Sequence, residues 1–446
     1  MSGERPDQRT RGKRSRGNEP AAGRETATRV PEQVIGTKYV RLLEKQIRTL
    51  REETAHGNRR LFLDDVFVAY LLAFHNPAVR SLRTLEDLSQ TPQAQKHLSV
   101  ERISRSTLSD FNRLIEPERL VPIIEALRSQ LNRKLAGRVG PEAGPEHDLN
   151  ELLRQTVAVD GTFLHAVAGV AWSVANSNNH GAVRHRARLD AHLNVSTWLP
   201  EAIVVPAAEQ SEADSAVAHL QADRIYLYDR GYMSFALLAA HYKTAGGDEA
   251  DIKSQFVMRY KPAGGNSPEL CEAVDRPLTD EDRAAGIQSD RTGYFTSDTA
   301  RRTGVSRLRL REVILSYEDK GKTKTLRLIT SLMDVSANTV AMLYRYRWQV
   351  ELFFRWFKSY AHFGHLISHS REGVQTHLYV TIIAVLLMYL HTGHRPSRYM
   401  FALLGQVAAG AATLEEILPI LRERARQSEL DRLSAARRRA KKRSGR

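Results

Sequence analysis

Cysteine is almost absent from this chain of 446 residues, in which Cys271 is the single example. One cysteine cannot build a disulfide framework within the chain or a cysteine-rich zinc module, so both are excluded. Its scarcity fits a reducing cytosol. Folding must therefore depend on an apolar core, for which a hydrophobic content of 42% is sufficient.

Long apolar runs are also missing. The most apolar stretch, residues 378–390, has 13 residues, which is too short to span a bilayer and indicates a buried helix. No apolar segment of signal-peptide length follows the first basic residues. We therefore expect a cytoplasmic protein with no membrane partner.

Acidic residues are fewer than basic ones: the chain has 51 Asp and Glu residues against 66 Lys and Arg residues, which gives a net charge of +15. The excess lies mainly at the ends: residues 1–31 have a net charge of +4 and residues 431–446 have +7. These tails fit contact with a polyanion, but they fit solubilising, disordered ends equally well. Charge alone therefore supports nucleic-acid binding without establishing it.

Hydrophobic patterning divides the chain into a helical part, an α/β core and a β-rich segment within that core. The predicted regions are a disordered basic tail at 1–31, a helical and DNA-binding domain at 32–136, a core at 150–262 and 336–392, a β-rich insertion at 263–335, a helical region at 393–433 and a basic tail at 434–446.

The core pattern alternates strands with helices and predicts a mixed α/β sheet. Apolar strand patterns occupy residues 156–164, 188–195, 201–206, 224–229 and 255–260, and helical patterns occupy 209–220 and 234–244. In the insertion, the turn-forming residues 318–322 separate two strand patterns and predict a hairpin.

The helical domain contains several short amphipathic patterns. One of them follows Thr107, a plausible N-cap. Short helices of this kind suit a helix-turn-helix-like DNA-binding domain, and they suit a plain helical bundle equally well. The pattern leaves both interpretations open.

Two aspartates end apolar strands, Asp160 before Gly161 and Asp229 before Arg230. Strand ends in an α/β sheet hold side chains rigidly at the solvent boundary, which suits catalytic groups. Each motif also fits a simple turn.

A third acidic residue lies in a predicted long helix at residues 338–360. Helical spacing puts Tyr344, Arg347, Glu351, Arg355 and Lys358 in one strip beside an aromatic core face. A solvated charged face with an incidental ion pair to Glu351 would give the same pattern. Three cations around one carboxylate instead indicate phosphate contacts around a metal ligand.

Two aspartates and a glutamate suit phosphodiester chemistry. Cleavage of this bond develops charge on both the attacking and the leaving oxygen, and two divalent ions held by hard oxygen ligands neutralise both. The residues Asp160, Asp229 and Glu351 supply such ligands.

The spacing Tyr344-x2-Arg347-x3-Glu351-x6-Lys358 resembles the Y-(2)-R-(3)-E-(6)-K signature of bacterial transposases of the insertion-sequence 4 family. The resemblance covers residues 150–392 and implies a ribonuclease-H-like core that binds two Mg²⁺ or Mn²⁺ ions. It implies that the metal ligands are Asp160, Asp229 and Glu351.

The resemblance also implies roles in DNA contact for the residues around this site. Those predicted to contact DNA are Tyr344, Arg347, Trp348, Arg355, Lys358 and Arg230. Trp348 is either an aromatic contact to a flipped base or a core residue.

The implied reaction is cut-and-paste transposition of an insertion sequence, with cleavage at the element ends and strand transfer into target DNA. The implied partners are double-stranded DNA and a second copy of the chain in a synaptic dimer, in association with the bacterial nucleoid. Two other functions remain open: a catalytically inactive, transposase-derived DNA-binding protein, and a metal-dependent nuclease on the same core. Strand transfer would separate the transposase from the nuclease.

Overall fold

The structure is a computed structural model that describes most of the chain between residues 81 and 393. The described residues are 81–95, 101–114, 116–136, 145–165, 174–177, 183–207, 209–243, 252–261, 268–319, 321–360 and 370–393, with scattered residues in 66–79 and 399–434. The predictions for the tails 1–31 and, apart from Ser434, 434–446 lie outside the described residues.

One mixed sheet of ten strands organises the described chain. The strands are β1 Thr156–His165, β2 Val174–Ser177, β3 Val183–Asn194, β4 Pro200–Val204, β5 Ile225–Tyr228, β6 Gln255–Tyr260, β7 Cys271–Asp275, β8 Ile287–Tyr294, β9 Leu310–Asp319 and β10 Lys322–Thr330. Their order is β2-β3-β1-β5-β6-β10-β9-β8-β7, with β4 paired to β3. The predicted mixed α/β architecture is therefore confirmed.

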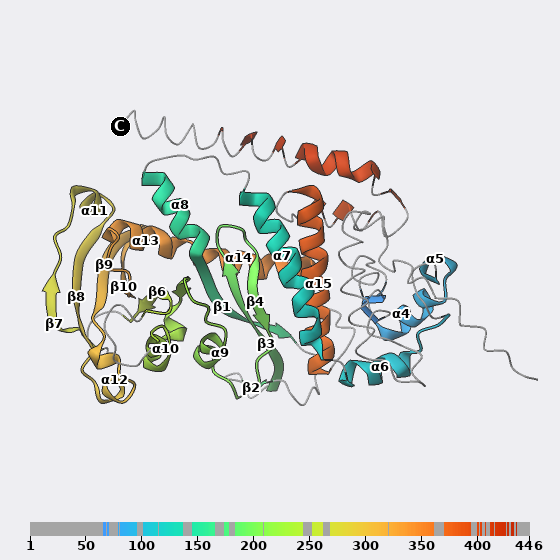
Figure 1. Cartoon of the computed structure of the whole chain (residues 1–446), viewed down its shortest axis with the longest axis horizontal. Helices are drawn as coiled ribbons and strands as arrows, with labels where there is room; N and C mark the ends of the chain where they lie inside the picture. The colour runs from blue at the N-terminus through green and yellow to red at the C-terminus, as the bar shows by residue number, and fades with distance from the viewer. Residues whose placement is uncertain are drawn as a thin grey trace, which may run out of the picture.

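The central strand β1 runs antiparallel to β3 and parallel to β5. Successive side chains of a strand point to opposite faces of the sheet. Val157 and Val159 accordingly lie in one core, whereas Ala158 lies in the other. The first core is shared with α9 (Glu212–Ala218) and α10 (Phe235–Ala240), and the second with α13 (Ala337–Arg345), α14 (Trp348–Tyr360) and α15 (Arg371–Thr392). The sheet thus has helices on both faces (Figure 1).

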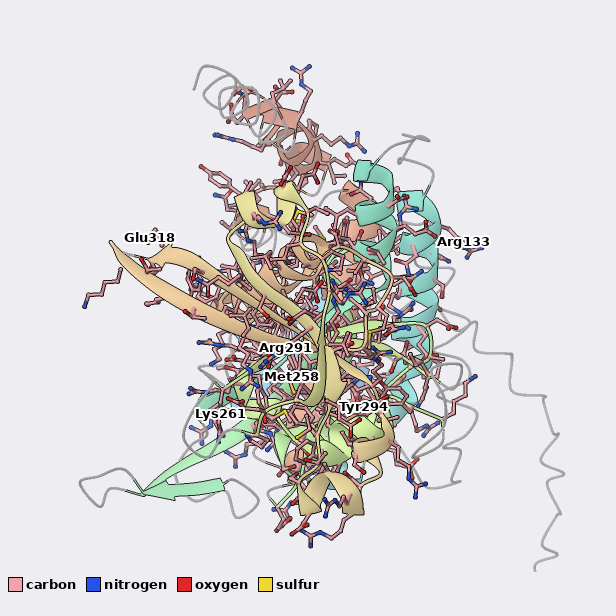
Figure 2. The ribbon with its side chains drawn as sticks, turned by 90° about the vertical axis from the view of Figure 1, so that its left-hand side faces the viewer. Arg133, Met258, Lys261, Arg291, Tyr294 and Glu318 are labelled. Atoms are coloured by element: carbon pink, nitrogen blue, oxygen red, sulfur yellow. The ribbon has the colours of Figure 1, made fainter. Side chains whose placement is uncertain are left out.

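The segment predicted as a β-rich insertion carries β7 to β10 and the short helices α11 (Asp280–Ala284) and α12 (Asp298–Arg302). Because β10 pairs antiparallel with β6, these strands extend the core sheet and do not form a sheet of their own. The predicted hairpin joins β9 and β10, with Gly321 at a φ of 73° in its turn. Glu318 lies near the outer end of this hairpin (Figure 2).

Buried ion pairs hold the insertion strands together. Arg311, which is fully buried, donates hydrogen bonds of 2.8 and 2.7 Å to the two carboxylate oxygens of Asp290. Glu312 accepts hydrogen bonds from Arg291 and Arg327. These two consecutive charged residues of β9 are both buried, and their ion pairs cross-link β9 to β8 and β10.

The N-terminal helices are α4 Leu82–Ser89, α5 Pro92–Gln95, α6 Arg105–Leu114, α7 Val121–Ala136 and α8 Pro145–Gln155. Of these, α7 and α6 pack against the C-terminal helix α15, α4 packs on α6, and α8 leads into β1 (Figure 1). Ser370 donates a 2.9 Å hydrogen bond to the carbonyl oxygen of Asn112. The predicted cap at Thr107 is wrong: α6 begins two residues earlier, and Ser104 Oγ accepts a hydrogen bond from the Thr107 N–H.

The prediction of a buried helix at 378–390 is confirmed, because this stretch lies within α15 and is enclosed by the protein. In the described part of the chain, α15 alone has the length and apolar composition of a membrane span, at Arg371–Leu390. That segment is completely buried inside the protein, as expected of a core helix.

Candidate active site

Asp160 lies where two parallel strands separate. The strand β1 pairs with β5 only through residues 156–158, while its pairing with β3 continues past Asp160. Because Asp160 alternates with Val159 along β1, its side chain points to the face that α14 covers. Its Oδ1 accepts a 2.9 Å hydrogen bond from the Gly161 N–H.

Asp229 directly follows β5, at the end where β5 has left β1. Its Oδ1 accepts a 2.7 Å hydrogen bond from the Arg230 N–H and so caps the short 3₁₀-helix η2 (Arg230–Tyr232). On the adjacent strand β6, Arg259 Nη1 lies 3.7 Å from the same carboxylate oxygen. Both side chains of this pair are substantially exposed, so Arg259 faces solvent beside Asp229.

Arg347 connects the acidic residues of separate elements. Its Nη2 donates a hydrogen bond to Glu351 Oε1 in the first turn of α14, and its Nη1 lies 3.9 Å from Asp160 Oδ2. The negative charge of Asp229 also acts on the guanidinium. Two of the predicted acidic residues, from β1 and α14, therefore contact one arginine, and the third, at the end of β5, acts on it through its charge.

The pKa values around Arg347 reflect this crowding of charge. Burial raises the pKa of Asp160 to about 7; the charge of Arg347 opposes this rise, and the charge of Glu351 adds to it. Burial disfavours the charged form of Arg347, but the hydrogen bond with Glu351 and the surrounding negative charges outweigh it and raise the pKa of Arg347. Burial is therefore the main cause of the shift at Asp160, and the charges of Arg347 and Glu351 modify it in opposite directions.

The predicted single helix at 338–360 is wrong, because two helices, α13 and α14, meet at Tyr346 and Arg347. At this junction the amide N–H groups of Tyr346, Arg347, Gln349 and Val350 bond to carbonyls three residues earlier. Such a tightened turn often occurs at functional positions. It puts Arg347 at the start of α14, one helical turn before Glu351.

The tightened turn changes how two residues of the predicted strip are presented. Tyr344 is buried, and its hydroxyl lies near Arg347 and Asp229 without a hydrogen bond of regular geometry. Burial raises the pKa of this hydroxyl. Lys358 is exposed and lies within electrostatic range of Asp160, so it belongs to the edge of the site.

The remaining predicted DNA contacts are exposed: Arg230 beside Asp229, and Arg355 and Trp348 on α14. Trp348 is 49% exposed, which excludes the core-packing interpretation for this side chain. One turn later, Leu352 is exposed as well. An apolar pair therefore stands at the surface directly beside Glu351.

The sequence interpretation missed two charged residues that the structure brings to this site, Arg259 and Glu212. Arg259 interrupts the apolar strand at residues 255–260, and this interruption was the available signal. Glu212 begins α9, next to the segments of both aspartates. Its sequence pattern resembles an ordinary acidic first turn, so only the fold reveals its position.

Among the residues that the structure describes, no three Asp, Glu, His or Cys side chains are grouped so that they could hold a metal ion. Two of the predicted ligands, Asp160 and Glu351, instead contact the guanidinium of Arg347. The donors are hard oxygen atoms, which are the ligands preferred by Mg²⁺ and Mn²⁺.

Comparison with known proteins identifies one relative by sequence. This protein of Geobacillus stearothermophilus, described as "Probable transposase for insertion sequence element IS5377", is 32% identical over 109 residues. The matched stretch covers 24% of this chain and 27% of the relative, so the chain spans about a quarter of that protein's length.

A solved structure of the piggyBac transposase synaptic complex with hairpin DNA aligns with 88% of this chain and 83% of its own chain, at 12% identity and a TM-score of 0.36. A likeness of this degree does not define the fold. The stronger match is to a family: residues 151–387, more than half of the chain, match the transposase DDE domain. The chain therefore belongs to the transposase DDE domain family.

Proposed function

We propose that the chain cleaves double-stranded DNA at the ends of an insertion sequence and joins the released ends to target DNA, with Asp160, Asp229 and Glu351 as metal ligands. Membership of the transposase family supports the reaction class. The mixed sheet, with antiparallel β3 and parallel β5 beside β1, supports a ribonuclease-H-like core of the insertion-sequence 4 type.

One observation carries the assignment of the ligands. The guanidinium of Arg347 contacts Glu351 and Asp160, and the negative charge of Asp229 raises its pKa. The three carboxylates come from three elements that are far apart in the sequence. Three unrelated carboxylates rarely converge at the surface of a protein unless a cation binds there, because their mutual repulsion destabilises the fold.

The donor set fits two divalent ions. Two of the carboxylates, those of Glu351 and Asp160, already flank one positive group, the guanidinium of Arg347, and a divalent ion would take the place of that charge. When bound, Mg²⁺ or Mn²⁺ would favour deprotonation of an attacking water or 3′-hydroxyl and neutralise charge on the leaving oxygen. The residues of the chain would hold the phosphodiester in place for this chemistry.

Cations at the rim of the site supply that positioning. Arg230 is exposed beside Asp229, and Lys358 is exposed within electrostatic range of Asp160. Arg259 faces solvent next to Asp229, and Arg355 is exposed on α14. We assign phosphate contacts to these side chains and, once DNA and metal ions bind, to Arg347 and Tyr344.

The exposed indole of Trp348 suits stacking on an unpaired base, since every base offers a flat face to an aromatic ring. A base at the end of an element, once unstacked, would lie against this ring beside Glu351. The proposal includes a homodimer that brings two element ends together in a synaptic complex, in association with the bacterial nucleoid.

The test is cleavage of linear DNA that carries the terminal repeats flanking the gene, followed by strand transfer into a target plasmid. We expect wild-type protein to cut at the repeat ends in Mg²⁺ and Glu351→Gln to lose this activity. Glu125→Gln, the same change at an exposed position of α7, is the matched control and should retain it.

Each outcome identifies one function. Cleavage followed by joining supports the transposase. Cleavage without joining to any target would make the protein a nuclease on this core. Specific binding of the repeats without cleavage by wild-type protein would make it an inactive DNA-binding derivative, and it would refute the assignment of Asp160, Asp229 and Glu351 as a working site.

A further inference from the structure

A fourth carboxylate, that of Glu212, lies between the two aspartate segments. It belongs to the first residue of α9. A Cβ atom on Gly161 would lie 2.8 Å from Glu212 Oε1, and one on Gly231 would lie 3.6 Å from Glu212 Oε2. This carboxylate therefore lies on the α9 side of β1, beside Gly161 and the η2 turn that follows Asp229. The Asp160 carboxylate points to the α14 side, and the charge of Glu212 still acts on it at the end of the strand pairing.

Glu212 has no positive partner of its own. Within the described ranges, no hydrogen bond or ion pair to its carboxylate is present. The positive charge that acts on Glu212 is that of Arg188, which donates hydrogen bonds of 2.9 and 3.1 Å to Asp190 and another of 3.2 Å to the carbonyl oxygen of Ser211. Burial and the charge of Asp190 raise the pKa of Glu212. A half-buried carboxylate among other acids is costly unless a cation joins it.

A buried hydroxyl faces the same group of acids. Tyr232 is only 2% exposed, and its hydroxyl has no hydrogen-bond partner. The charges of Asp190, Glu212 and Asp160 all act on it and, together with burial, raise its pKa. An unpaired buried hydroxyl costs about 1–3 kcal/mol, so such groups normally contact an ordered water or a bound ion.

We propose that Glu212 is a fourth ligand of the divalent-ion site and binds one of the ions directly or through a water that also meets the Tyr232 hydroxyl. This inference rests on the proposed function, because the ions are those that Asp160 and Asp229 hold. It gives a reason for glycine at position 161, since a methyl group there would displace the Glu212 carboxylate. Carboxylate oxygens and water are the donors that Mg²⁺ and Mn²⁺ prefer.

The experiment is a titration of the full chain with Mn²⁺, in which binding is measured by calorimetry and by the electron paramagnetic resonance signal of free Mn²⁺. We expect Glu212→Gln to weaken the affinity of one ion by about tenfold or more. Without metal, Glu212→Gln should be at least as resistant to urea as wild type, because it removes a carboxylate that repels its neighbours. A purely structural role for Glu212 would instead lower that resistance and leave Mn²⁺ binding intact.

Three further variants make the test specific. Glu209→Gln, the same change at an exposed position three residues earlier, should bind Mn²⁺ like wild type. Gly161→Ala should also weaken Mn²⁺ binding, because its methyl group would lie 2.8 Å from Glu212 Oε1 and 3.0 Å from Asp190 Oδ1 and would displace these carboxylates. Gly231→Ala should have a smaller effect on Mn²⁺ binding, since its methyl group makes only ordinary contact.

The outcomes separate this inference from the proposed function. If Asp160→Asn weakens Mn²⁺ binding and abolishes DNA cleavage but Glu212→Gln binds Mn²⁺ within twofold of wild type, the role of Glu212 is refuted and the transposase assignment stands. If wild-type protein neither binds Mn²⁺ nor cleaves DNA, both are refuted.

Discussion

Replacing Arg347 by glutamine is expected to destabilise the metal-free protein and to increase the stabilisation that Mn²⁺ provides. Arg347 contacts both Glu351 and Asp160, so its guanidinium occupies the position of a cation between two proposed metal ligands. Glutamine keeps much of the side-chain volume and removes the charge. The variant therefore tests whether arginine and metal compete for the same carboxylates.

The size of the effect follows from the exposure and separation of the charges. The side chains of Arg347, Glu351 and Asp160 are 11%, 28% and 24% exposed, so solvent screens these pairs only in part. At a separation of about 4 Å and an effective dielectric constant of about 20, one pair contributes about 4 kcal/mol before desolvation. Desolvation of the arginine offsets part of this gain, and we expect a net loss of about 2 kcal/mol in the free energy of unfolding.

Manganese should reverse the loss. An ion present at about 100 times its dissociation constant stabilises a folded protein by about 2.7 kcal/mol. In the wild type, the ion must first displace Arg347 from the carboxylates of Asp160 and Glu351. In Arg347→Gln no guanidinium occupies that position. The stabilities of the two proteins should therefore converge in saturating Mn²⁺.

The measurement is urea unfolding at pH 7.5 with and without Mn²⁺. Arg345→Gln, at an exposed position two residues earlier, is the matched control and should change little in either condition. An equal loss for Arg347→Gln with and without Mn²⁺ would mean that arginine and metal act independently, and it would refute the competition.

Two further predictions concern buried charge and buried histidine. Glu312 is fully buried between Arg291 and Arg327, so Glu312→Gln should lower the free energy of unfolding by about 3 kcal/mol, whereas Glu318→Gln on the exposed hairpin should have little effect in the same urea assay. Burial lowers the pKa of His241 from 6.5 to about 3. Below pH 6.5 the unfolded chain therefore binds a proton at this histidine and the folded chain does not, so the free energy of unfolding decreases as the pH falls. The difference in unfolding free energy between wild type and His241→Gln should shrink by about 2 kcal/mol from pH 7 to pH 5, and a constant difference would contradict this origin.

The strands of the core could be predicted because their apolar runs are continuous and end at turn residues. The predicted β6 coincides with residues 255–260, and β1 begins at Thr156 as predicted. The sequence did not predict β2, β7 or β8. The strand β7 is exposed along its whole length and β2 is short, so neither carries the apolar pattern that identifies a buried strand.

The assignment of the three acidic residues to one site stays a prediction, and their environment could not be predicted from the sequence. A helical wheel assumes one continuous helix, whereas the chain tightens at Tyr346 and Arg347 and buries Tyr344. Contacts between distant segments, such as Arg259 with Asp229 and Glu212 with Gly161, depend on which strands and helices become neighbours. No local pattern encodes that choice.

The balance of charge at the site suggests an order of binding. Since Asp190 pairs with Arg188, the uncompensated groups near the separation of β1 and β5 are four carboxylates and two guanidinium groups, namely Asp160, Asp229, Glu351, Glu212, Arg347 and Arg259. Without metal the sum of these central charges is negative and repels a phosphodiester, whereas the exposed cations Arg230, Arg355 and Lys358 attract it only as far as the rim. Two divalent ions would make the centre positive and attract the same group. We therefore expect metal ions and a DNA end to bind cooperatively, with Arg347 released from the carboxylates to a phosphate as both arrive.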